Sequence, residues 1–430
     1  MFEKRRRWTI LFGTALGLSC AFMMSTTYAG AQTPPPVQAG KCRSGIPSYS
    51  TIQAAVNAAA TGALVYVCPG IYPEQITISK NLSLQGIPNG TAAASVIVPP
   101  TGGLIQNATD PSPASANPSI AAQIFVQGPA TVNLSNVLID GGNNQLSGCT
   151  SPTLVGVYYQ NASGTLSSLN VRNEVLDPAD AGCASGLGMY FEANTATSIT
   201  VNISTLVNFQ KNGMTANGYG NGSPGPVVYF WSNEIVGRGR MAGIAQNGVQ
   251  IGFGATGKMT KNVLADFVSS TSAAATGVLV YSSNGFNVNS NQIGNAQVGV
   301  AVVSDPIFGS ADSNNVNVST ITSAIDGVSL CSNTNIVKSN QINSTTEAGV
   351  KVDTSCTEGS VGGSSGSGNS VTNNTINGGC AGVLAGTGTG NVFSPNSIIN
   401  VFQSLVSGST CTPPPGMPSV TTAGRPLPFR

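Results

Sequence analysis

The sequence predicts an all-β fold in which short parallel strands coil repeatedly into a solenoid, with a helix capping its first turn. Three observations support this prediction: a glycine pattern that recurs along the chain, an asparagine pattern between its copies, and the composition. The 430 residues include 53 glycines, and only 8% are charged. Such a composition favours short strands and turns over helices.

The glycine pattern is a glycine followed by an apolar residue and then by alternating residues. Successive copies lie 22 to 35 residues apart. They begin at Gly156, Gly188, Gly213, Gly248, Gly277, Gly299, Gly327, Gly349 and Gly382. A repeat of this length is typical of architectures in which each unit buries its apolar face on its neighbours.

The asparagine pattern is Asn-x-apolar, and it falls between the glycine copies. Its members are Asn136, Asn173, Asn233, Asn262, Asn291, Asn340 and Asn374, with Ser204 and Ser319 in two further units. In most units an apolar residue precedes the polar one by three positions: Val201, Phe230, Met259, Val288, Val316, Val337 and Val371. An amide both donates and accepts hydrogen bonds, so amides stacked at one bend can satisfy each other.

Stacked strands explain both patterns together. One apolar pair in a short strand cannot form a core, but coils about 4.8 Å apart bury each pair on the next. Helical repeats require apolar residues at a period of 3.6, which the chain lacks, so we exclude them.

Composition also excludes several functions. The chain has no histidine, so it contains no Ser-His-Asp triad, Cys-His dyad or histidine-ligated zinc. With 17 Lys and Arg and a net charge of +1, it lacks the basic surplus that nucleic-acid binding requires. We therefore expect no nucleic-acid partner.

Residues 1–31 have the features of an export signal. A basic start at Lys4–Arg7 precedes an apolar run at Ile10–Met24, and Ala29 and Ala31 form a small-residue cleavage pattern. An uncleaved anchor is the alternative. Cleavage predicts a secreted, periplasmic or cell-surface protein that is free of the membrane, and we expect a monomer. A Pro-rich leader (32–44), a repeat domain (45–411) and a Pro-rich tail (412–430) follow.

Eight cysteines remain beyond the signal, an even number that indicates disulfides in an oxidising compartment. Sequence alone does not fix their connectivity. Pairing of neighbours predicts Cys42–Cys68, Cys149–Cys183, Cys331–Cys356 and Cys380–Cys411. Unpaired buried thiols are the alternative.

Solenoid ends need caps. Residues 50–60 predict an amphipathic helix with a Ser or Thr N-cap, which would cover the first turn. The first strands are predicted at 64–67, 75–78 and 82–84, and the far end is expected to be closed by 391–411.

The opening of the domain resembles that of the pectin-lyase-like superfamily. The resemblance rests on the segments Tyr49–Ala59, Val65–Glu74 and Lys80–Gly86, which are similar to the start of pectin methylesterases and of β-helix repeat proteins. It extends over roughly residues 45–410 through the two repeat patterns. It implies a right-handed parallel β-helix, but this opening builds only the first turn and does not imply an activity.

The catalytic motifs of that superfamily are missing. Pectin methylesterases are known by Q-D, D-F-I-F-G and L-G-R-P-W motifs, and only Asp305–Gly309 approaches one of them, without the Phe after Asp. Polygalacturonases need G-H-G, which a chain without histidine lacks. No Asp cluster like that of pectate lyases is evident either. We therefore do not expect pectin methylesterase or polygalacturonase activity.

A groove is expected on the strand that carries the glycine pattern. Alternation points Val157, Tyr159, Met189 and Phe191 inward and their neighbours outward. The outward residues form the candidate substrate-binding set: Tyr158, Gln160, Tyr190, Gln250 and Tyr281, with Glu192 beside them.

Long turns at one edge of this face hold most of the remaining charge, and long solenoid loops often carry function. They contain Asp177, Asp180, Arg238, Arg240 and Asp266. We take Glu192 or Asp180 as a candidate acid or nucleophile, and Arg238 or Arg240 as a candidate base or carboxylate clamp. We expect no cofactor. The alternative is a calcium ion bound by Asp177 and Asp180.

Two functions follow from this set. In the first, the protein binds or degrades extracellular polysaccharide, with tyrosines stacked on sugar rings; an enzyme of this kind would be a polysaccharide lyase or a glycoside hydrolase. In the second, the tyrosines pack under the loops, the charges pair, and the protein is a non-catalytic surface, adhesin or structural solenoid. Convergence of Glu192 and the arginines would favour the first.

Overall fold

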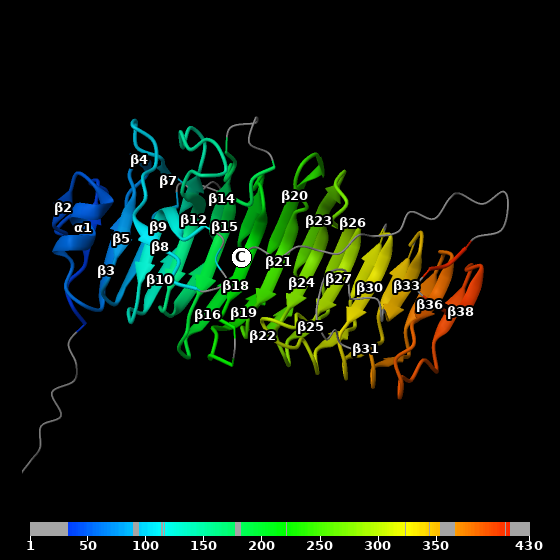
Figure 1. The fold of residues 1–430 in the computed structure, drawn as a ribbon. Coiled ribbons are helices and arrows are strands. Elements are labelled where there is room, and N and C mark those ends of the chain that lie inside the picture. Colours follow the sequence, from blue (N-terminus) through cyan, green and yellow to red (C-terminus); the bar gives the residue numbers. More distant parts are fainter. Residues whose placement is uncertain are drawn as a thin grey trace, which may run out of the picture. The chain divides into compact units, whose positions relative to one another are not determined.

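The computed structural model describes residues 33–88, 94–112, 115, 117–176, 182–220, 222–322, 324–343, 345–352, 366–408 and 410–412. The predicted export signal and almost all of the predicted tail lie outside these residues. Within residues 34–430, the described chain coils through three long sheets, which we call sheets A, B and C (Figure 1). Each complete coil passes from A to B to C.

Sheet A has 13 strands and sheet B has 12. The strands of sheet A are β1 (Val37–Ala39), β2 (Ser48–Tyr49), β3 (Ala63–Val67), β6 (Leu82–Gly86), β10 (Val132–Ser135), β13 (Gly164–Ser167), β16 (Ser198–Asn202), β19 (Val227–Trp231), β22 (Thr256–Thr260), β25 (Asn287–Asn289), β28 (Asn315–Asn317), β31 (Ile336–Lys338) and β34 (Ser370–Thr372). Those of sheet B are β4 (Gly70–Pro73), β7 (Ser95–Val98), β11 (Leu138–Asp140), β14 (Asn170–Arg172), β17 (Thr205–Val207), β20 (Glu234–Met241), β23 (Val263–Ser269), β26 (Gln292–Ala296), β29 (Thr320–Thr322), β32 (Gln341–Asn343), β35 (Thr375–Asn377) and β37 (Ser397–Ile399).

Sheet C has 13 strands, including one short antiparallel strand, β8 (Ala108–Thr109), which pairs with β9. Its parallel strands are β5 (Ile76–Ile78), β9 (Ser119–Gln127), β12 (Thr153–Gln160), β15 (Leu187–Glu192), β18 (Asn212–Asn217), β21 (Asn247–Gly252), β24 (Thr276–Tyr281), β27 (Val298–Val303), β30 (Asp326–Cys331), β33 (Ala348–Val352), β36 (Ala381–Ala385) and β38 (Gln403–Ser407). The predicted all-β solenoid is confirmed.

The nine pattern glycines lie in one column of sheet C, where each coil closely approaches the next. A Cβ atom on Gly299 would lie 2.5 Å from the carbonyl oxygen of Gly327 and 2.5 Å from Cγ2 of Ile321. The other eight positions meet the next coil's backbone oxygen at 2.5–2.8 Å in the same way. No larger residue fits there without moving the backbone. The glycine pattern in the sequence therefore marks the positions at which neighbouring coils are in direct contact.

The apolar residues of both patterns form the core. The residue after each pattern glycine points inward, as do the predicted partners in sheet A from Val201 to Val371, and all are at most 1% exposed. The inward direction predicted for Val157, Tyr159, Met189 and Phe191 is confirmed.

A buried asparagine ladder fills the bend from sheet A to sheet B. It runs through Ser204, Asn233, Asn262, Asn291, Ser319, Asn340 and Asn374 and continues to Asn396. The amide of Asn233, for example, donates to Oδ1 of Asn262 at 2.9 Å, and Asn262 donates to Asn291 at 2.9 Å. For these seven predicted positions the ladder is confirmed.

The prediction was wrong for Asn136 and Asn173. Strand register places Val137 and Leu169 at the ladder position in those coils. Asn136 (φ 55°) and Asn173 (φ 61°) are half-buried and adopt left-handed conformations at bends. Asparagine tolerates this conformation better than most residues, so here it serves the turn and does not form the ladder.

A second ladder, at the bend from sheet C to sheet A, was not predicted. It runs through Asn314, Asn335, Asn369 and Asn391, each amide accepting a backbone N–H from the residue one coil earlier. Each of these residues stands two positions before an inward apolar residue, which is a signal that the sequence contains.

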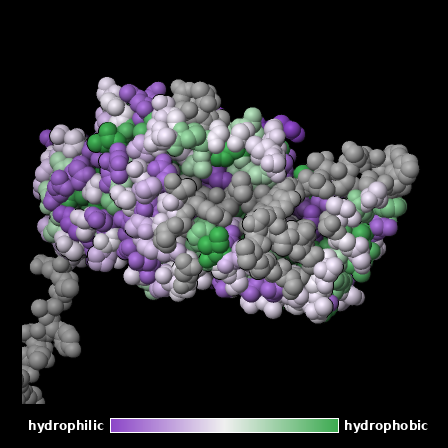
Figure 2. Space-filling view, viewed as in Figure 1, coloured by the Kyte–Doolittle hydropathy of each residue, from purple (hydrophilic) through white to green (hydrophobic). Residues whose placement is uncertain are grey.

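The N-terminal cap matches its prediction. Helix α1 (Ile52–Ala58) has Thr51 as N-cap, whose side chain accepts from the N–H of Ala54 at 3.0 Å. Hydrophilic residues gather over these first coils (Figure 2), as expected of a solvated capping repeat. The predicted strands at 64–67, 75–78 and 82–84 correspond to β3, β5 and β6.

The domain begins earlier than predicted, and its far end is built differently from the expected closure. Strand β1 pairs with β2 and β3, so sheet A begins inside the predicted leader 32–44. Residues 391–411 add β37 and β38 as a further partial coil and leave Ile399 and Leu405 about half exposed, so among the described residues they extend the sheets.

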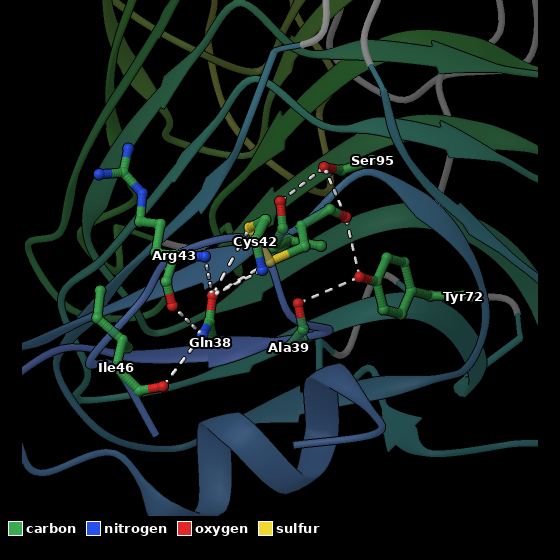
Figure 3. The surroundings of a disulfide bond; sticks show 9 residues. Gln38, Ala39, Cys42, Arg43, Ile46, Tyr72 and Ser95 are labelled. Atoms are coloured by element: carbon green, nitrogen blue, oxygen red, sulfur yellow. Dashed lines mark hydrogen bonds between the residues drawn. A yellow bond between two sulfur atoms is a disulfide. The ribbon is translucent and has the colours of Figure 1, made fainter. Parts of the chain in front are cut away.

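Three predicted disulfides are present: Cys42–Cys68, Cys149–Cys183 and Cys380–Cys411. Around the first, Gln38 accepts from the N–H groups of Cys42 and Arg43, and Tyr72 donates to the carbonyl oxygens of Ala39 and Cys68 (Figure 3). The fourth predicted pair includes Cys356, which lies outside the described residues. No helix among the described residues has the length and apolar character needed to cross a bilayer.

Candidate functional site on the outer face of sheet C

The predicted groove residues do lie on the outer face of sheet C. We call them the sheet C strip: Tyr158, Gln160, Tyr190, Glu192, Thr215, Asn217, Gln250 and Tyr281. Alternation along β12, β15, β18, β21 and β24 points them away from the core, as predicted. All except Gln160 are at most 3% exposed, so this face is covered in the described structure.

The tyrosines are packed against other rings. Tyr158 stacks between Phe125 at 5.4 Å and Tyr190 at 5.0 Å between ring centroids. The short arm Ala108–Asp110 lies over them, because β8 pairs with β9 and Ala108 joins their apolar cluster. These ring faces are therefore occupied, as expected from the interpretation in which the tyrosines pack under the loops.

A pair of carboxyl groups, Asp110 and Glu192, lies among these tyrosines. Tyr190 donates its hydroxyl to Asp110 Oδ2 at 3.0 Å, and Tyr158 donates to Glu192 Oε2. Asp110 Oδ1 also accepts from the N–H of Ser112 at 2.8 Å. Asp110 lies close enough to Glu192 to raise the pKa of that carboxyl group, and Oε1 of Glu192 is buried without a hydrogen-bond partner.

Glu192 is the acid of this pair that holds its proton more tightly than usual. Burial, followed by the proximity and charge of Asp110, raises the pKa of Glu192 well above its usual value, while Tyr158 and Gln160 oppose the shift in part. Burial and the nearby acids likewise raise the pKa of Tyr158 and Tyr190. Glu192 therefore keeps its proton to a higher pH than an exposed glutamate, beside a second carboxyl group.

Neutral side chains continue the strip along the solenoid. Asn212 donates to Thr215 at 2.9 Å and to Gln250 at 3.1 Å, and Gln250 donates to Asn217 at 2.9 Å. Asn247 and Thr276 extend the chain of contacts at 3.1 and 2.7 Å. These amides and hydroxyls are buried and bond to one another, so they hold neighbouring coils together beneath the cover.

The far end of the strip is closed by the turn Asp305–Gly309. Tyr281 donates its hydroxyl to Asp305, whose other oxygen accepts the N–H groups of Ile307 at 2.8 Å and Phe308 at 3.2 Å. Phe308 packs edge-on against Phe253 at 5.3 Å. The partial resemblance of this segment to an esterase motif thus corresponds to a structural turn.

The predicted arginines lie elsewhere. Arg238 and Arg240 are exposed on β20 of sheet B, and neither contributes to the electrostatic environment of Glu192. Asp177 and Asp180, with the predicted calcium site, lie outside the described residues. Asp266 accepts from Asn295 at 2.7 Å on sheet B. Among the predicted acid and base residues that the structure describes, it brings only Glu192 to the strip.

Sequence reasoning missed Asp110, which is 82 positions before Glu192 and reaches it through the arm. It also missed Lys211, whose Nζ donates to the carbonyl oxygen of Ala245 at 2.7 Å and whose pKa is lowered to about 7 by burial. Neither residue belongs to a repeated column, so no periodic signal marks it.

Two further buried acids lie outside the strip's centre. Burial and then the charge of Asp140 raise the pKa of Glu174, which sits inside the coil against Gly141 and Gly156. Burial and then Glu347 raise the pKa of Asp326, and Lys351 pairs with Glu347 at 3.4 Å. No three Asp, Glu or Cys side chains in the described part of the chain are grouped for metal binding.

No family model matches the chain, and no curated protein matches it significantly. Solved structures do. A GH136 lacto-N-biosidase from Eubacterium ramulus is 11% identical, with a TM-score of 0.56 over 85% of this chain and 68% of that one. The A-module of mannuronan C-5 epimerase AlgE6 from Azotobacter vinelandii is 18% identical, with a TM-score of 0.53 over 84% and 94%. The A-module of mannuronan C-5 epimerase AlgE4 from the same organism is 17% identical, with a TM-score of 0.54 over 83% of this chain and 94% of that one.

Identities this low establish the fold alone. Together with the three long sheets of parallel strands, they show a right-handed parallel β-helix. The fold implied by the sequence resemblance is thereby confirmed.

Proposed function

We propose that the protein binds and cleaves an extracellular polysaccharide at the sheet C strip, with Glu192 as the proton donor and Asp110 as its partner. The observation that carries this proposal is a buried pair of neighbouring carboxyl groups, in which Tyr158 donates to Glu192 and Tyr190 donates to Asp110. Carbohydrate-active proteins named among the similar structures support the substrate class.

The chemistry follows from the raised pKa of Glu192. A carboxyl group that stays protonated at neutral pH can protonate the oxygen of a glycosidic bond as that bond breaks. The Asp110 carboxylate would then stabilise the positive charge that develops on the sugar, or accept a proton from the attacking water.

The covered pair must open to substrate for this reaction, because Asp110 and Glu192 are at most 2% exposed. In glycoside hydrolases the two carboxyl groups stand about 5–9.5 Å apart, with the reacting bond between them. Glu192 is fixed in β15, whereas Asp110 is carried by the arm after β8. We infer that substrate displaces the arm and moves Asp110 away from Glu192, and that Arg238 and Arg240 take no part.

Export and a monomeric state complete the proposal. The three disulfides are consistent with an oxidising compartment, and the basic and apolar start of the chain supports secretion, the periplasm or the cell surface.

A non-catalytic surface or structural solenoid is the second candidate. The observation that favours it is the burial of Tyr158, Tyr190 and Tyr281, whose rings are at most 1% exposed. In that case the carboxyl pair only joins the arm to sheet C.

The deciding experiment compares wild type with Glu192→Gln on a panel of plant and microbial polysaccharides, measuring both cleavage and binding. Glutamine keeps the shape and a hydrogen-bond donor toward Asp110 but has no acidic proton. We expect turnover to fall by about 10²–10⁴-fold. Glu234→Gln, on the exposed outer face of β20, is the matched control and should retain wild-type turnover.

Melting temperatures of all three proteins at pH 7 would show that the variants remain folded. If wild type neither cleaves nor binds any glycan, or if Glu192→Gln cleaves as fast as wild type, the second candidate is correct.

A further inference from the structure

The outer face of sheet A holds an open groove that the sheet C strip does not involve. Its volume is about 800 Å³. It crosses β22, β25, β28 and β31 and is lined by Lys258, Met259, Thr260, Asn287, Asn289, Asn315, Asn317, Val318, Ile336, Lys338 and Ser339. We call it the sheet A groove. No residue of its lining is acidic.

Two aromatic residues adjoin one end of the groove. Tyr229 and Trp231 on β19 are 37% and 40% exposed, which is unusual for large aromatic side chains. Strand register places them beside Lys258 and Thr260, and the Lys258 ammonium stands 5.7 Å from the centroid of the Tyr229 ring. Flat exposed rings of this kind can pack against the apolar face of a sugar.

The middle of the groove presents two rows of amides. Asn287 and Asn315 are in register, as are Asn289 and Asn317, so their side chains repeat about every 4.8 Å. Asn315 donates to Asn287 at 2.9 Å. Oδ1 of Asn317 is buried without a hydrogen-bond partner, so the amide rows do not fully satisfy each other.

Two ammonium groups mark the ends of the amide rows. Lys258 on β22 and Lys338 on β31 are exposed and are separated by three strand steps, or about 14 Å. Without an acidic residue in the lining, the groove is electropositive and complements an anion.

We propose that the sheet A groove binds an acidic polysaccharide whose uronate carboxylates pair with Lys258 and Lys338, with a sugar ring on Tyr229 or Trp231. The chain would run across the strands, along the solenoid axis, and its hydroxyls would bind the amide rows. Two cations over this length suit a chain with neutral sugars between uronates. A densely sulfated chain would place most of its anions against amides.

This site is separate from the proposed catalytic one, because its residues point outward from sheet A and those of the strip from sheet C. The inference therefore does not depend on cleavage. It predicts an accessory surface that holds the protein on acidic, partly substituted glycans.

The test measures binding of the full chain by isothermal titration calorimetry at low salt. Pectin with half of its carboxyl groups methyl-esterified is the probe, with neutral dextran and dextran sulfate for comparison. We expect the pectin to bind wild type and the dextran not to bind. The double variant Lys258→Gln/Lys338→Gln should weaken pectin binding at least tenfold, and Trp231→Ala at least fivefold.

Lys41→Gln removes one charge from an exposed lysine outside the groove and should change the affinity less than twofold. Glu234→Gln changes an exposed residue of sheet B, outside both the groove and the sheet C strip, and should also leave this affinity unchanged. The inference is overturned if wild type does not bind the pectin, if dextran or dextran sulfate binds more tightly, if the double variant binds like wild type, or if sedimentation shows that a second copy occupies the face.

Discussion

Sheets A and C are built from the same coils, yet their outer faces differ. The face of sheet C carries stacked tyrosines and a carboxyl pair, and it is almost fully buried, with the arm Ala108–Asp110 over one end and the turn Asp305–Gly309 over the other. The face of sheet A carries lysines, amides and two aromatics that remain open. The core beneath both is the same set of stacked aliphatic residues.

The difference shows that the segments packed over a sheet determine whether the side chains on its outer face stay hydrated and charged. Under a cover, carboxyl groups lose hydration and hold their protons. On the open face, ionic groups keep water and are available to a ligand from solution. Stability should therefore depend strongly on the outer face of sheet C and weakly on that of sheet A.

The largest expected contrast is between aromatic residues on the two faces. Tyr158→Ala removes a fully buried ring from a three-ring stack and should lower the free energy of unfolding by about 3–5 kcal/mol. Trp231→Ala removes a ring that is 40% exposed and should cost about 1 kcal/mol or less. Urea unfolding followed by circular dichroism measures both. Equal losses in the free energy of unfolding for the two variants would show that the segments covering sheet C do not contribute to stability.

Amides provide a smaller contrast. Gln250→Met removes hydrogen bonds to Asn212 and Asn217 in a site that is 0% exposed, so we expect a loss of about 2–3 kcal/mol. Asn315→Ala removes one bond on the open face and should cost about 0.5 kcal/mol. The same unfolding experiment applies. A loss from Asn315→Ala as large as that from Gln250→Met would contradict the comparison.

The smallest effect is a dependence of stability on pH. Because the pKa of Glu192 is raised in the folded state, its contribution is full below its unfolded pKa and is lost as pH rises through the folded value. Wild type should therefore lose stability between pH 5 and 7. Glu192→Gln should lose less, by up to about 1.4 kcal/mol per pH unit.

Glu174 and Asp326 act in the same direction and remain in the variant, so part of the slope persists. Lys211, with a pKa of about 7, acts in the opposite direction above that pH, which is why the range ends at 7. Melting curves at half-unit steps measure the slope. Identical slopes for the two proteins would mean that Glu192 is not protonated in the folded state.

The fold could be predicted because its signals are periodic. Each pattern glycine contacts the next coil directly, so the spacing of the glycines reports the spacing of the coils. The asparagine signal was less specific. Asn-x-apolar also fits a left-handed bend, as at Asn136 and Asn173, and only strand register separates the two uses.

The candidate site could be predicted only in part. Alternation placed Tyr158, Tyr190 and Glu192 on one face, but it carries no information about what covers that face. Asp110 reaches Glu192 through an arm outside the repeat, and burial of the pair depends on that arm. Arg238 and Arg240 were assigned by their closeness in sequence to the sheet C strands, whereas β20 continues through them in sheet B.

The glycine column also limits how such a molecule can change in length. Because each glycine fixes the distance to its neighbour, only whole coils can be inserted or deleted without a collision. One added coil would displace every later group by about 4.8 Å along the axis on all three faces at once. The lengths of the open groove and of the covered strip along the solenoid axis therefore change together, by one coil at a time. Neither can be extended while the other stays fixed.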